Sequence, residues 1–448
     1  MKNLKRDFTS GNASKLLLGL VVPIFMSFLL TIAYNIIDTL WVGNLMGEEA
    51  VAALTVSYPI VLLLTSVAMG GSNGTSILIS KFFGAKDEEG KNKSISTAVI
   101  LSVFSSIIIS VLCIILVNPI LNLLNTPADI FDGSKSYLVI YLCGFIFVNI
   151  FLYLSAIARS LGNSVVQMEF LAISSVLNII LDPIFIKLIG IKGAAFATVL
   201  SEGIMVVCMI VYFKKHKFIK VRLKDFDTSI CKLLLQKSIP SIIQQCIPAV
   251  STSFVTSIVG GFGVSVIAGF GICGKVEGIL LYPAMALNMA LTVAAGQCVG
   301  AKKVGKAKEY LRFGLLYGIV STFVLALIVT LCSGYISNAF VRSDEVITVV
   351  RSYFLIIFIG YVCNAISNCI LGIINGSGNP AVVMYFMIFY YCIVRMPLAK
   401  ILANTSLKTN GIWIAVLISH LAAMVTILIY YKLVLTKKIK EEMKLGVA

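Results

Sequence analysis

Charged residues are scarce in this sequence. Asp, Glu, Lys and Arg together make up 12% of the chain, about half of the roughly 25% that is typical of soluble domains. Hydrophobic residues make up 59% and gather in blocks of about twenty or more. The shortage of charge excludes a soluble globular fold, and the long apolar blocks predict an all-α integral membrane protein that crosses the bilayer many times.

Histidine is scarcer still, with two residues, and His420 has no second ligand four positions further along its segment. The eleven cysteines contain no Cys-x-x-Cys pair, and most lie inside apolar blocks. These absences argue against a histidine-based metal centre and a disulfide framework. No pairing of nucleophile and base stands out in the apolar blocks, so we expect a protein that is not an enzyme and carries no cofactor.

Twelve apolar segments remain when the chain is divided at its charged or Gly/Pro/Asn-rich clusters. Each is long enough to cross about 30 Å of hydrocarbon at about 1.5 Å per residue. The segments are residues 16–42, 50–80, 94–117, 136–158, 165–186, 193–213, 239–259, 264–298, 311–333, 346–373, 381–402 and 411–432.

The distribution of Lys and Arg predicts the orientation of these segments. With the N-terminus inside, the inner connections and adjoining helix ends hold 27 of the 36 Lys and Arg residues, and the outer ones hold eight. This bias follows the positive-inside rule and predicts cytoplasmic N- and C-termini in the cell membrane. The basic balance is therefore an orientation signal and does not indicate a nucleic-acid partner.

The two halves of the chain resemble each other at a constant offset of about 216 residues. Gly84-Ala85-Lys86 recurs as Gly300-Ala301-Lys302, and Gly162-Asn163 recurs as Gly378-Asn379. Six spans per half is an even number, so both copies keep the same orientation and form parallel repeats. We expect two pseudo-symmetric six-helix lobes with substrate binding between them.

The longest connection, residues 214–238, separates the expected lobes, which are residues 1–213 and 239–448. It carries eight Lys and Arg residues. Asp227 and Thr228 can cap a short helix with three apolar residues on one face. We expect this amphipathic helix to lie on the cytoplasmic membrane surface. Its apolar residues are Ile230, Leu233 and Leu234.

Three expected spans of the first lobe place polar side chains at one depth near the outer surface. Asp38 lies inside the first apolar segment, where an ionised carboxylate is costly and indicates a functional site. The fifth and sixth spans reach the same depth with Asp182 and Thr198. Each residue has a polar partner four positions away, on the same helix face. The three pairs are Tyr34/Asp38, Asn178/Asp182 and Thr198/Glu202.

Two kinds of cation chemistry fit this cluster. Two carboxylates in a low-dielectric cavity oppose each other's ionisation, so one of them can hold a proton near neutral pH. Carboxylate, amide and hydroxyl oxygens also suit a hard cation such as Na⁺. We expect a site that couples transport to H⁺ or Na⁺; the alternative is that the acids cap helix ends or line a structural contact. The candidate Na⁺ ligands are Asp38, Asn178, Asp182 and Thr198.

The second lobe lacks these acids, because the offset takes Asp38 to Phe254 and Asp182 to Leu398. It offers amides instead, which we interpret either as the lining of a polar cavity or as hydrogen-bonding groups between helices. The amides are Gln244, Gln245, Asn364 and Asn368.

Lys275 and Glu277 lie in the eighth span, two residues apart, so they do not face each other on a regular helix. Two interpretations stay open: a role in substrate binding or coupling, and a structural buried charge. The string Gly269-x-x-x-x-Gly274-Lys275 resembles a nucleotide-binding loop. Val276 replaces the required Ser or Thr and the string lies within a span, so we expect no nucleotide partner.

Pro23 lies in the first span, where it removes a backbone donor and can act as a hinge. Because Asp38 lies further along the same segment, a change of charge there can bias the bend. A static kink is the alternative.

Taken together, these features resemble the multidrug and toxic compound extrusion (MATE) transporters over essentially the full length. The resemblance implies a V-shaped secondary antiporter that exports amphipathic, often cationic organic compounds in exchange for H⁺ or Na⁺. The features that carry it are the two six-span lobes, Pro23 with Asp38, Gly84-Ala85-Lys86, Asn178-x-x-x-Asp182-Pro183 and Gly296-Gln297-x-x-Gly300-Ala301.

Within that family the chain is most similar to the DinF-like branch. There the resemblance implies a cation site at Tyr34, Asp38, Asn178, Asp182 and Thr198. The NorM-like branch uses acids on the seventh and tenth spans, where this chain has only amides.

Two other cargoes stay open: a lipid-linked saccharide, as in a flippase of the same superfamily, and a dedicated metabolite. A flippase would line its cavity with cations for phosphate, and only Lys275 and Arg395 are candidates. We expect small organic substrates and the lipid bilayer as partners, and a monomer.

Overall fold

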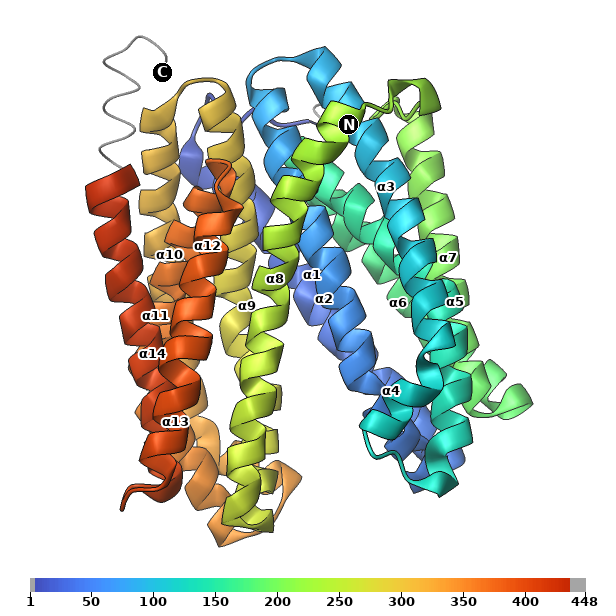
Figure 1. Ribbon diagram of the computed structural model, residues 1–448, viewed down its shortest axis with the longest axis vertical. Coiled ribbons are helices and arrows are strands. Elements are labelled where there is room, and N and C mark those ends of the chain that lie inside the picture. Colours follow the sequence, from blue (N-terminus) through green and yellow to red (C-terminus); the bar gives the residue numbers. More distant parts are fainter. Residues whose placement is uncertain (1–4, 436–448) are drawn as a thin grey trace. The chain divides into compact units, whose positions relative to one another are not determined.

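The computed structural model describes residues 5–435, and within this range it contains helices and no strand (Figure 1). Twelve of its helical segments are long and apolar enough to cross a membrane. The predicted fold class, an all-α membrane protein with twelve spans, is confirmed. Each predicted apolar segment corresponds to one of these helical segments, which mostly extend beyond the apolar run into polar flanks.

The first six spans are formed by α1 (Ala13–Met46), α2 (Glu48–Gly84), α3 (Glu88–Ile115), α5 (Ala128–Ser160), α6 (Val165–Ile189) and α7 (Ile191–Lys215). The next four are α8 (Thr228–Val259), α9 (Val264–Gly300), α10 (Val304–Phe340) and α11 (Asp344–Gly376). The eleventh span is built from α12 (Pro380–Met387), a π-helix (Ile388–Arg395) and α13 (Met396–Ala403), and the twelfth contains α14 (Lys408–Tyr430). The short helix α4 (Val117–Leu123) follows α3.

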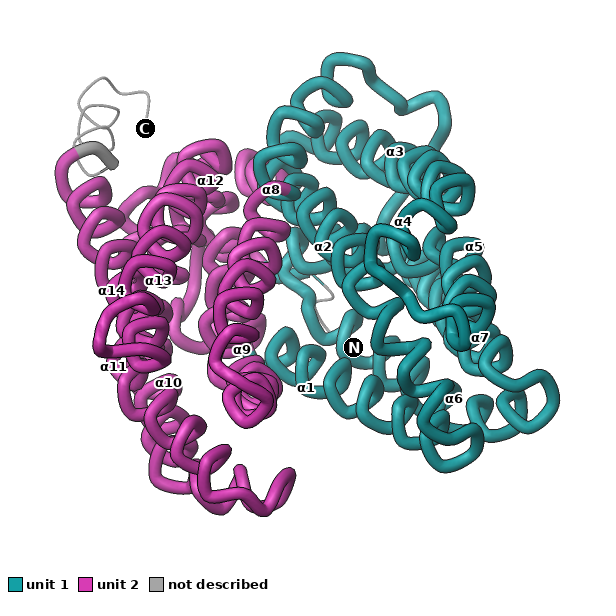
Figure 2. Tube along the Cα trace, turned by 60° about the horizontal axis from the view of Figure 1, so that its bottom comes forward, with its two compact units in different colours: residues 1–6, 22–79, 87–242 teal, residues 7–21, 80–86, 243–448 magenta. Residues whose placement is uncertain are grey.

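The described residues form two compact units, coloured separately in Figure 2. Unit 1 comprises residues 5–6, 22–79 and 87–242, and unit 2 comprises residues 7–21, 80–86 and 243–435. Residues 214–238, where the sequence predicts the division between lobes, lie inside unit 1, and the predicted division stays a prediction. The chain passes from one unit to the other inside α1, α2 and α8. Loops do not mark these crossings, because each one lies within a continuous helix.

The predicted lobes also included residues 1–4 and 436–448, which lie outside the described residues. The predicted linker, residues 214–238, lies within unit 1 and includes the end of α7 and the start of α8.

The amphipathic helix predicted in the linker is instead the first part of α8. Asp227 caps it as expected, since its Oδ1 accepts hydrogen bonds from the backbone N–H groups of Ser229 at 2.9 Å and Ile230 at 3.1 Å. The helix then continues without a break into the seventh span. Ile230 and Leu234 are buried within the protein, so this segment is part of the helical core and not a separate surface helix.

The repeat predicted from the 216-residue offset is visible in the backbone. Gly162 and Gly378 both have a φ of 88°, and Lys86 and Lys302 both have a φ of 59°. A positive φ means left-handed backbone, which is unusual for a lysine such as Lys86 or Lys302. The recurrence of these conformations at equivalent positions shows that the two halves share local geometry as well as sequence.

The glycines of the repeated Gly-Ala-Lys motif allow two helix ends to pack closely inside unit 2. A Cβ atom on Gly84 would lie 2.0 Å from the carbonyl oxygen of Gln297, and one on Gly300 would lie 2.0 Å from that of Lys81. Only glycine fits at such an approach of backbone to backbone. The motif therefore has a packing reason in both copies.

Candidate cation site

The five residues predicted to bind a cation lie together in unit 1. Helix α1 contributes Tyr34 and Asp38, α6 contributes Asn178 and Asp182, and α7 contributes Thr198. The spacing of four residues on α1 and α6 puts each pair on one helix face, as the sequence predicts. Helices α6 and α7 pack directly on each other.

Hydrogen bonds join the three helices at this site. The hydroxyl of Tyr34 donates to Oγ1 of Thr198 at 3.1 Å. The amide Nδ2 of Asn178 donates to Oδ1 of Asp182 at 2.9 Å and reaches Oγ1 of Thr198 at 3.5 Å. Asn178 and Asp182 are completely buried, so these bonds form away from solvent.

The carboxyl groups of Asp38 and Asp182 come within hydrogen-bonding reach of each other. Asp38 is 9% exposed and Asp182 is fully buried. Two ionised carboxylates cannot hydrogen-bond, because both only accept. Their approach therefore needs either a shared proton or a cation between them.

Several buried oxygens at this site have no hydrogen-bond partner among the described residues. They belong to Asp38 (Oδ1), Asn178 (Oδ1) and Asp182 (Oδ2). A buried unpaired acceptor is costly, so a cluster of three calls for a ligand that completes their hydrogen bonding or coordination. All three are oxygens, the atoms that a hard cation prefers.

The donor set also limits the ligand. In the part of the chain that the structure describes, no group of three or more His, Cys, Asp and Glu side chains gathers around one point. A transition-metal centre built from nitrogen and sulfur is therefore not supported there. The residues fit a proton or a small hard cation such as Na⁺.

Three residues that were not among the five predicted ligands also bear on this site. Glu202 lies one turn from Thr198 on α7 and has a buried Oε2 without a partner among the described residues. Its charge acts on Tyr137 and Tyr141, whose rings stack with centroids 6.4 Å apart. The sequence already pairs Glu202 with Thr198 by its spacing, without placing it among the ligands. The two tyrosines had no such signal, because aromatic residues are common in spans.

Three of the amides predicted for the second lobe take part in two separate groups of hydrogen bonds. Gln244 bonds across helices to Asn375, with distances of 3.3 and 3.4 Å, and donates to the carbonyl oxygen of Pro380 at 2.7 Å. Asn368 donates to Oδ1 of Asn364 at 2.9 Å in a separate cluster. Gln245 is only partly buried. These contacts support the interpretation as hydrogen bonds between and within helices.

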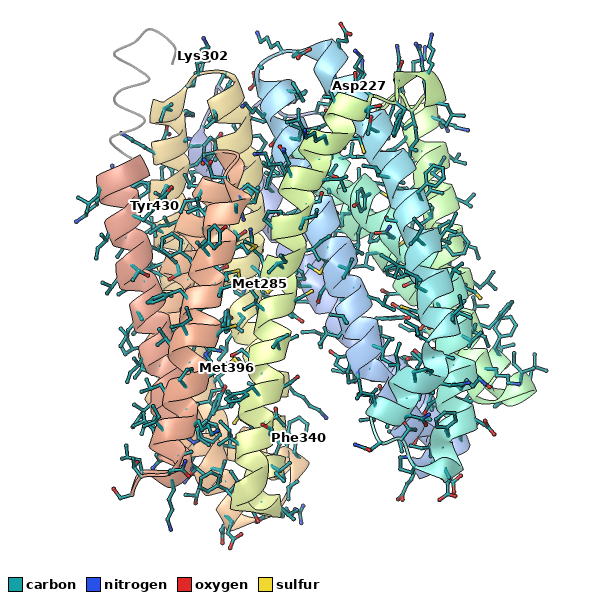
Figure 3. The ribbon with its side chains drawn as sticks, in the orientation of Figure 1. Asp227, Met285, Lys302, Phe340, Met396 and Tyr430 are labelled. Carbon is teal, nitrogen blue, oxygen red and sulfur yellow. The ribbon has the colours of Figure 1, made fainter. Side chains whose placement is uncertain are left out.

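Lys275 and Glu277 have different surroundings, as their spacing predicts. Lys275 is exposed, and its Nζ lies 5.8 Å from the ring centroid of Phe340. Phe340 is the last residue of α10, and Figure 3 shows it at the opposite end of that helix from Lys302. Glu277 is partly buried and accepts a hydrogen bond from the hydroxyl of Tyr361 at 3.3 Å. Lys275 therefore extends towards a helix end, whereas Glu277 points into unit 2.

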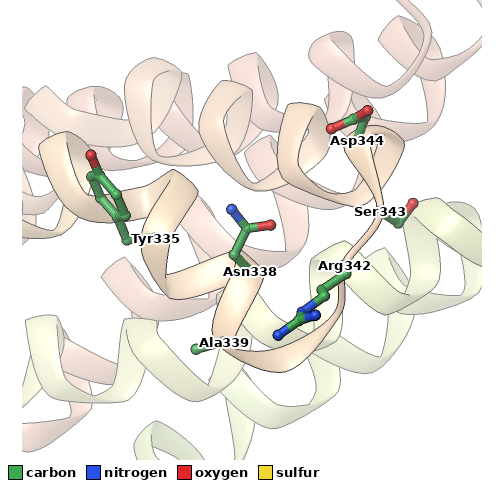
Figure 4. A pocket seen from close by; sticks show the side chains of 6 residues that line it. All are labelled: Tyr335, Asn338, Ala339, Arg342, Ser343 and Asp344. Carbon is green, nitrogen blue, oxygen red and sulfur yellow. The ribbon is translucent and has the colours of Figure 1, made fainter.

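A surface hollow in the turn between α10 and α11 is separate from both polar clusters (Figure 4). It carries no buried acid and does not match any predicted site. Its lining residues are Tyr335, Asn338, Ala339, Arg342, Ser343 and Asp344.

Comparison with known proteins identifies the repeat as a family signature. The MatE family model matches the chain twice, at residues 23–184 and 240–401. "Probable multidrug resistance protein YpnP" of Bacillus subtilis (strain 168) is 29% identical over 431 residues, covering 95% of this chain and 96% of the relative. "Probable multidrug resistance protein NorM" of Thermotoga maritima is 23% identical over 413 residues, covering 90% of this chain and 89% of the relative.

Solved structures have the same fold. "Crystal structure of MATE in complex with MaL6" has a TM-score of 0.91 at 22% identity, and the match covers 99% of this chain and 100% of that one. A D35N mutant of the Vibrio cholerae MATE transporter VcmN has a TM-score of 0.90 at 21% identity, covering 95% and 97%. The chain therefore belongs to the MatE family, that of the multi-pass MATE membrane transporters.

Proposed function

We propose that this protein is a multidrug exporter that exchanges amphipathic, often cationic organic compounds for H⁺ or Na⁺. Family membership and relatives named as multidrug resistance proteins support the export of organic compounds. The observation that carries the coupling is the set of three unpaired buried oxygens on Asp38, Asn178 and Asp182. A cation-coupled exporter needs a place where an inward-moving cation binds, and these unpaired oxygens are the ligands that we assign to it.

Cation binding at Asp38 and Asp182 has a direct electrostatic effect. Two ionised carboxylates in a buried place repel each other, and a bound cation neutralises that repulsion. A cation therefore stabilises the conformation in which the two carboxylates are close, and substrate must favour the other conformation. Alternating access follows from the competition between these two preferences.

Helix α1 connects this site to the rest of the chain. Pro23 lies inside α1, and its carbonyl oxygen accepts a hydrogen bond from Oγ of Ser27 at 2.8 Å. Within α1 the chain enters unit 1 at Val22, directly before the proline. We propose that α1 bends here when the charge at Asp38 changes, because proline removes one backbone hydrogen bond from the helix.

The orientation in the membrane is part of the same proposal. The excess of Lys and Arg in one set of connections supports a cell-membrane orientation with both termini on the cytoplasmic side. Asp38 and Asp182 then lie towards the outer side, so the coupling cation reaches them from outside and leaves to the cytoplasm.

The test is transport by the purified protein in liposomes under an imposed pH or Na⁺ gradient. Asp38→Asn should abolish uphill export of a fluorescent organic cation, because the site loses the charge that holds the cation. The matched control is Asp129→Asn, which removes an exposed acid of the same unit and should leave export unchanged. The gradient that drives export by the unaltered protein identifies the ion.

Undiminished export by correctly inserted Asp38→Asn protein would refute the site. Scrambling of lipid by the unaltered protein, without any export of organic cations, would instead favour the flippase alternative.

A further inference from the structure

Unit 2 contains a second buried polar cluster, around Glu277 and Arg395, which the proposed coupling site does not use. Glu277 lies on α9, and its Oε1 accepts a hydrogen bond from Tyr361 of α11 at 3.3 Å. The hydroxyl of Tyr353, also on α11, is a second hydrogen-bonding neighbour of this carboxyl. Two tyrosine hydroxyls thus surround one acid inside the unit.

Arg395 supplies the opposite charge. It is 7% exposed and lies at the end of the π-helix in the eleventh span. Its Nε donates to Oγ of Ser419 at 2.9 Å, and its guanidinium carbon lies 4.4 Å from the ring centroid of Tyr391. Among the described residues, no carboxylate lies within ion-pair distance of this guanidinium, although the charges of Arg395 and Glu277 interact through space.

His420 is excluded as the proton-binding group of this cluster. Its Nε2 lies 3.1 Å from Nη2 of Arg395. A guanidinium can only donate, so this imidazole nitrogen must accept and carries no proton. The ring is therefore uncharged, and Glu277 is the group that can change its charge.

The cluster is packed too closely for an organic molecule. Along α9, Cys273, Val276 and Leu280 are buried, and on α11 Tyr353 and Tyr361 are buried in the same hydrophobic core. A proton needs no such space. The partial exposure of Glu277 gives a proton access to its carboxyl.

We propose that Glu277 is a proton-binding site of unit 2, with Arg395 as its built-in counter-ion. Without the proton, the carboxylate balances the guanidinium, and the tyrosine hydroxyls donate to a charged acceptor. With the proton on one carboxyl oxygen, the cluster carries the net positive charge of Arg395, and those hydrogen bonds weaken. Because Arg395 already supplies a positive charge, the cluster is selective for H⁺ over Na⁺.

The titratable and charged neighbours of Glu277 come from α9, α11 and the π-helix, and α14 lies beyond them. Helix α10 contributes the apolar residues Ala326 and Val329 to the same core. The neighbours are Cys273 on α9, Tyr353 and Tyr361 on α11, and Tyr391 and Arg395 on the π-helix, with His420 of α14 beyond Arg395.

The role of Glu277 in transport rests on the proposed antiport. If a proton binds Glu277, part of the pH dependence of export does not depend on Asp38. Binding itself can be measured without transport, because the chain has two tryptophans, one in each unit. Trp413 is fully buried, and its ring lies 4.9 Å from that of Tyr353 and 5.5 Å from that of Phe270. It therefore reports on the Glu277 cluster through Tyr353.

The experiment follows tryptophan fluorescence of the purified protein in detergent between about pH 5 and 9, without substrate or gradient. In Trp41→Phe protein, only Trp413 emits, and we expect a single reversible transition. Adding Glu277→Gln should abolish that transition, because the amide cannot ionise. Adding Asp38→Asn should leave it in place, since Asp38 belongs to unit 1.

A further variant tests the counter-ion. Arg395→Met in the Trp41→Phe background should move the transition to higher pH by at least about one unit, because loss of the positive charge favours the protonated acid. If Glu277→Gln protein does not fold, Tyr361→Phe decides. Loss of its hydroxyl removes a donor to the carboxylate, and the midpoint should also rise.

Any of three results would overturn the proposal. The Trp41→Phe protein could show no transition, adding Glu277→Gln could leave the transition unchanged, or adding Tyr361→Phe could leave its midpoint unmoved. Failure of the coupling at Asp38 appears separately, as export that survives Asp38→Asn.

Discussion

The two units hold buried polar clusters of opposite character. In unit 1, Asp38 and Asp182 approach each other, and acceptor oxygens are left without partners among the described residues. In unit 2, the acid Glu277 and the base Arg395 are both present, and Arg395 donates to Ser419 at 2.9 Å. One cluster lacks positive charge and the other contains its own.

This difference shows that the two copies of the repeat have kept their backbone while their chemistry has diverged. Gly162 and Gly378 share the same backbone angle, but the repeat offset takes Asp38 to Phe254. A cluster that cannot balance its own charge needs a ligand from outside. A balanced cluster can respond to a proton and otherwise stabilises the fold.

The largest expected effect on stability comes from removing Arg395. Arg395→Met leaves the buried acceptors on Ser419 and His420 without their donor, and each unpaired group costs about 1–3 kcal/mol. We expect the free energy of unfolding to fall by about 3 kcal/mol. Asp38→Asn should instead raise it or leave it within about 1 kcal/mol, because it relieves repulsion in a functional site.

Denaturant unfolding in detergent, followed by far-UV circular dichroism, measures both variants under the same conditions. Arg395→Lys serves as the matched control, since it keeps a charge and one donor and should lose less than Arg395→Met. If Asp38→Asn and Arg395→Met lose the same free energy of unfolding, the two clusters do not differ in how much their charges stabilise the fold.

Much of the fold and of the first cluster could be predicted from the sequence, because both leave strong local signals. Apolar runs indicate spans through length alone. An acid such as Asp38 inside such a run is costly, and the four-residue spacing of Asn178 and Asp182 reports a shared helix face. The structure brings these side chains together as predicted.

The second cluster could not be predicted, because its parts are far apart in sequence and depend on irregular backbone. Arg395 lies at the end of a π-helix, whose wider turn changes which residues face inwards. Sequence periodicity assumes a regular α-helix and so does not pair Arg395 with Ser419 or Glu277. The boundaries of the two compact units leave no sequence signal for a related reason, since α1 and α8 carry the chain between units without any loop.

A smaller effect tests whether the two copies remain equivalent where they still match in sequence. Gly84→Ala and Gly300→Ala each place a Cβ atom 2.0 Å from a backbone carbonyl oxygen. Neither carbonyl can move without its helix, so we expect each variant to lose about 1–3 kcal/mol, and by similar amounts.

Thermal unfolding of the two variants measures this equivalence. Gly305→Ala is the control, because a Cβ there meets nothing within 4 Å, and it should be neutral or stabilising. If only one of Gly84→Ala and Gly300→Ala lowers the stability, the two copies of the repeat are not equivalent at these helix ends.

The smallest effect concerns an acid that, unlike those of unit 1, has its hydrogen bonds satisfied. The backbone N–H groups of Ile230 and Ser229, with the Lys93 ammonium at 3.5 Å, hold the pKa of Asp227 below its ordinary value. Its charge therefore stabilises the fold above the unfolded-state pKa of about 3.9, and this contribution is lost as pH falls through the folded-state pKa.

Asp227→Asn keeps the capping acceptor but removes the charge, so it should unfold slightly more easily than the unaltered protein at pH 7. The difference should shrink as the pH falls below about 4, because the unaltered carboxylate then becomes protonated. Thermal unfolding at a series of pH values measures this difference, and Asp227→Ala, which lacks the acceptor, should remain less stable throughout. A difference between Asp227→Asn and the unaltered protein that stays constant down to pH values well below 4 would mean that the charge of Asp227 contributes nothing. Asp227 could then not serve as the example of a hydrogen-bonded, stabilising acid against which Asp38 and Asp182 are compared.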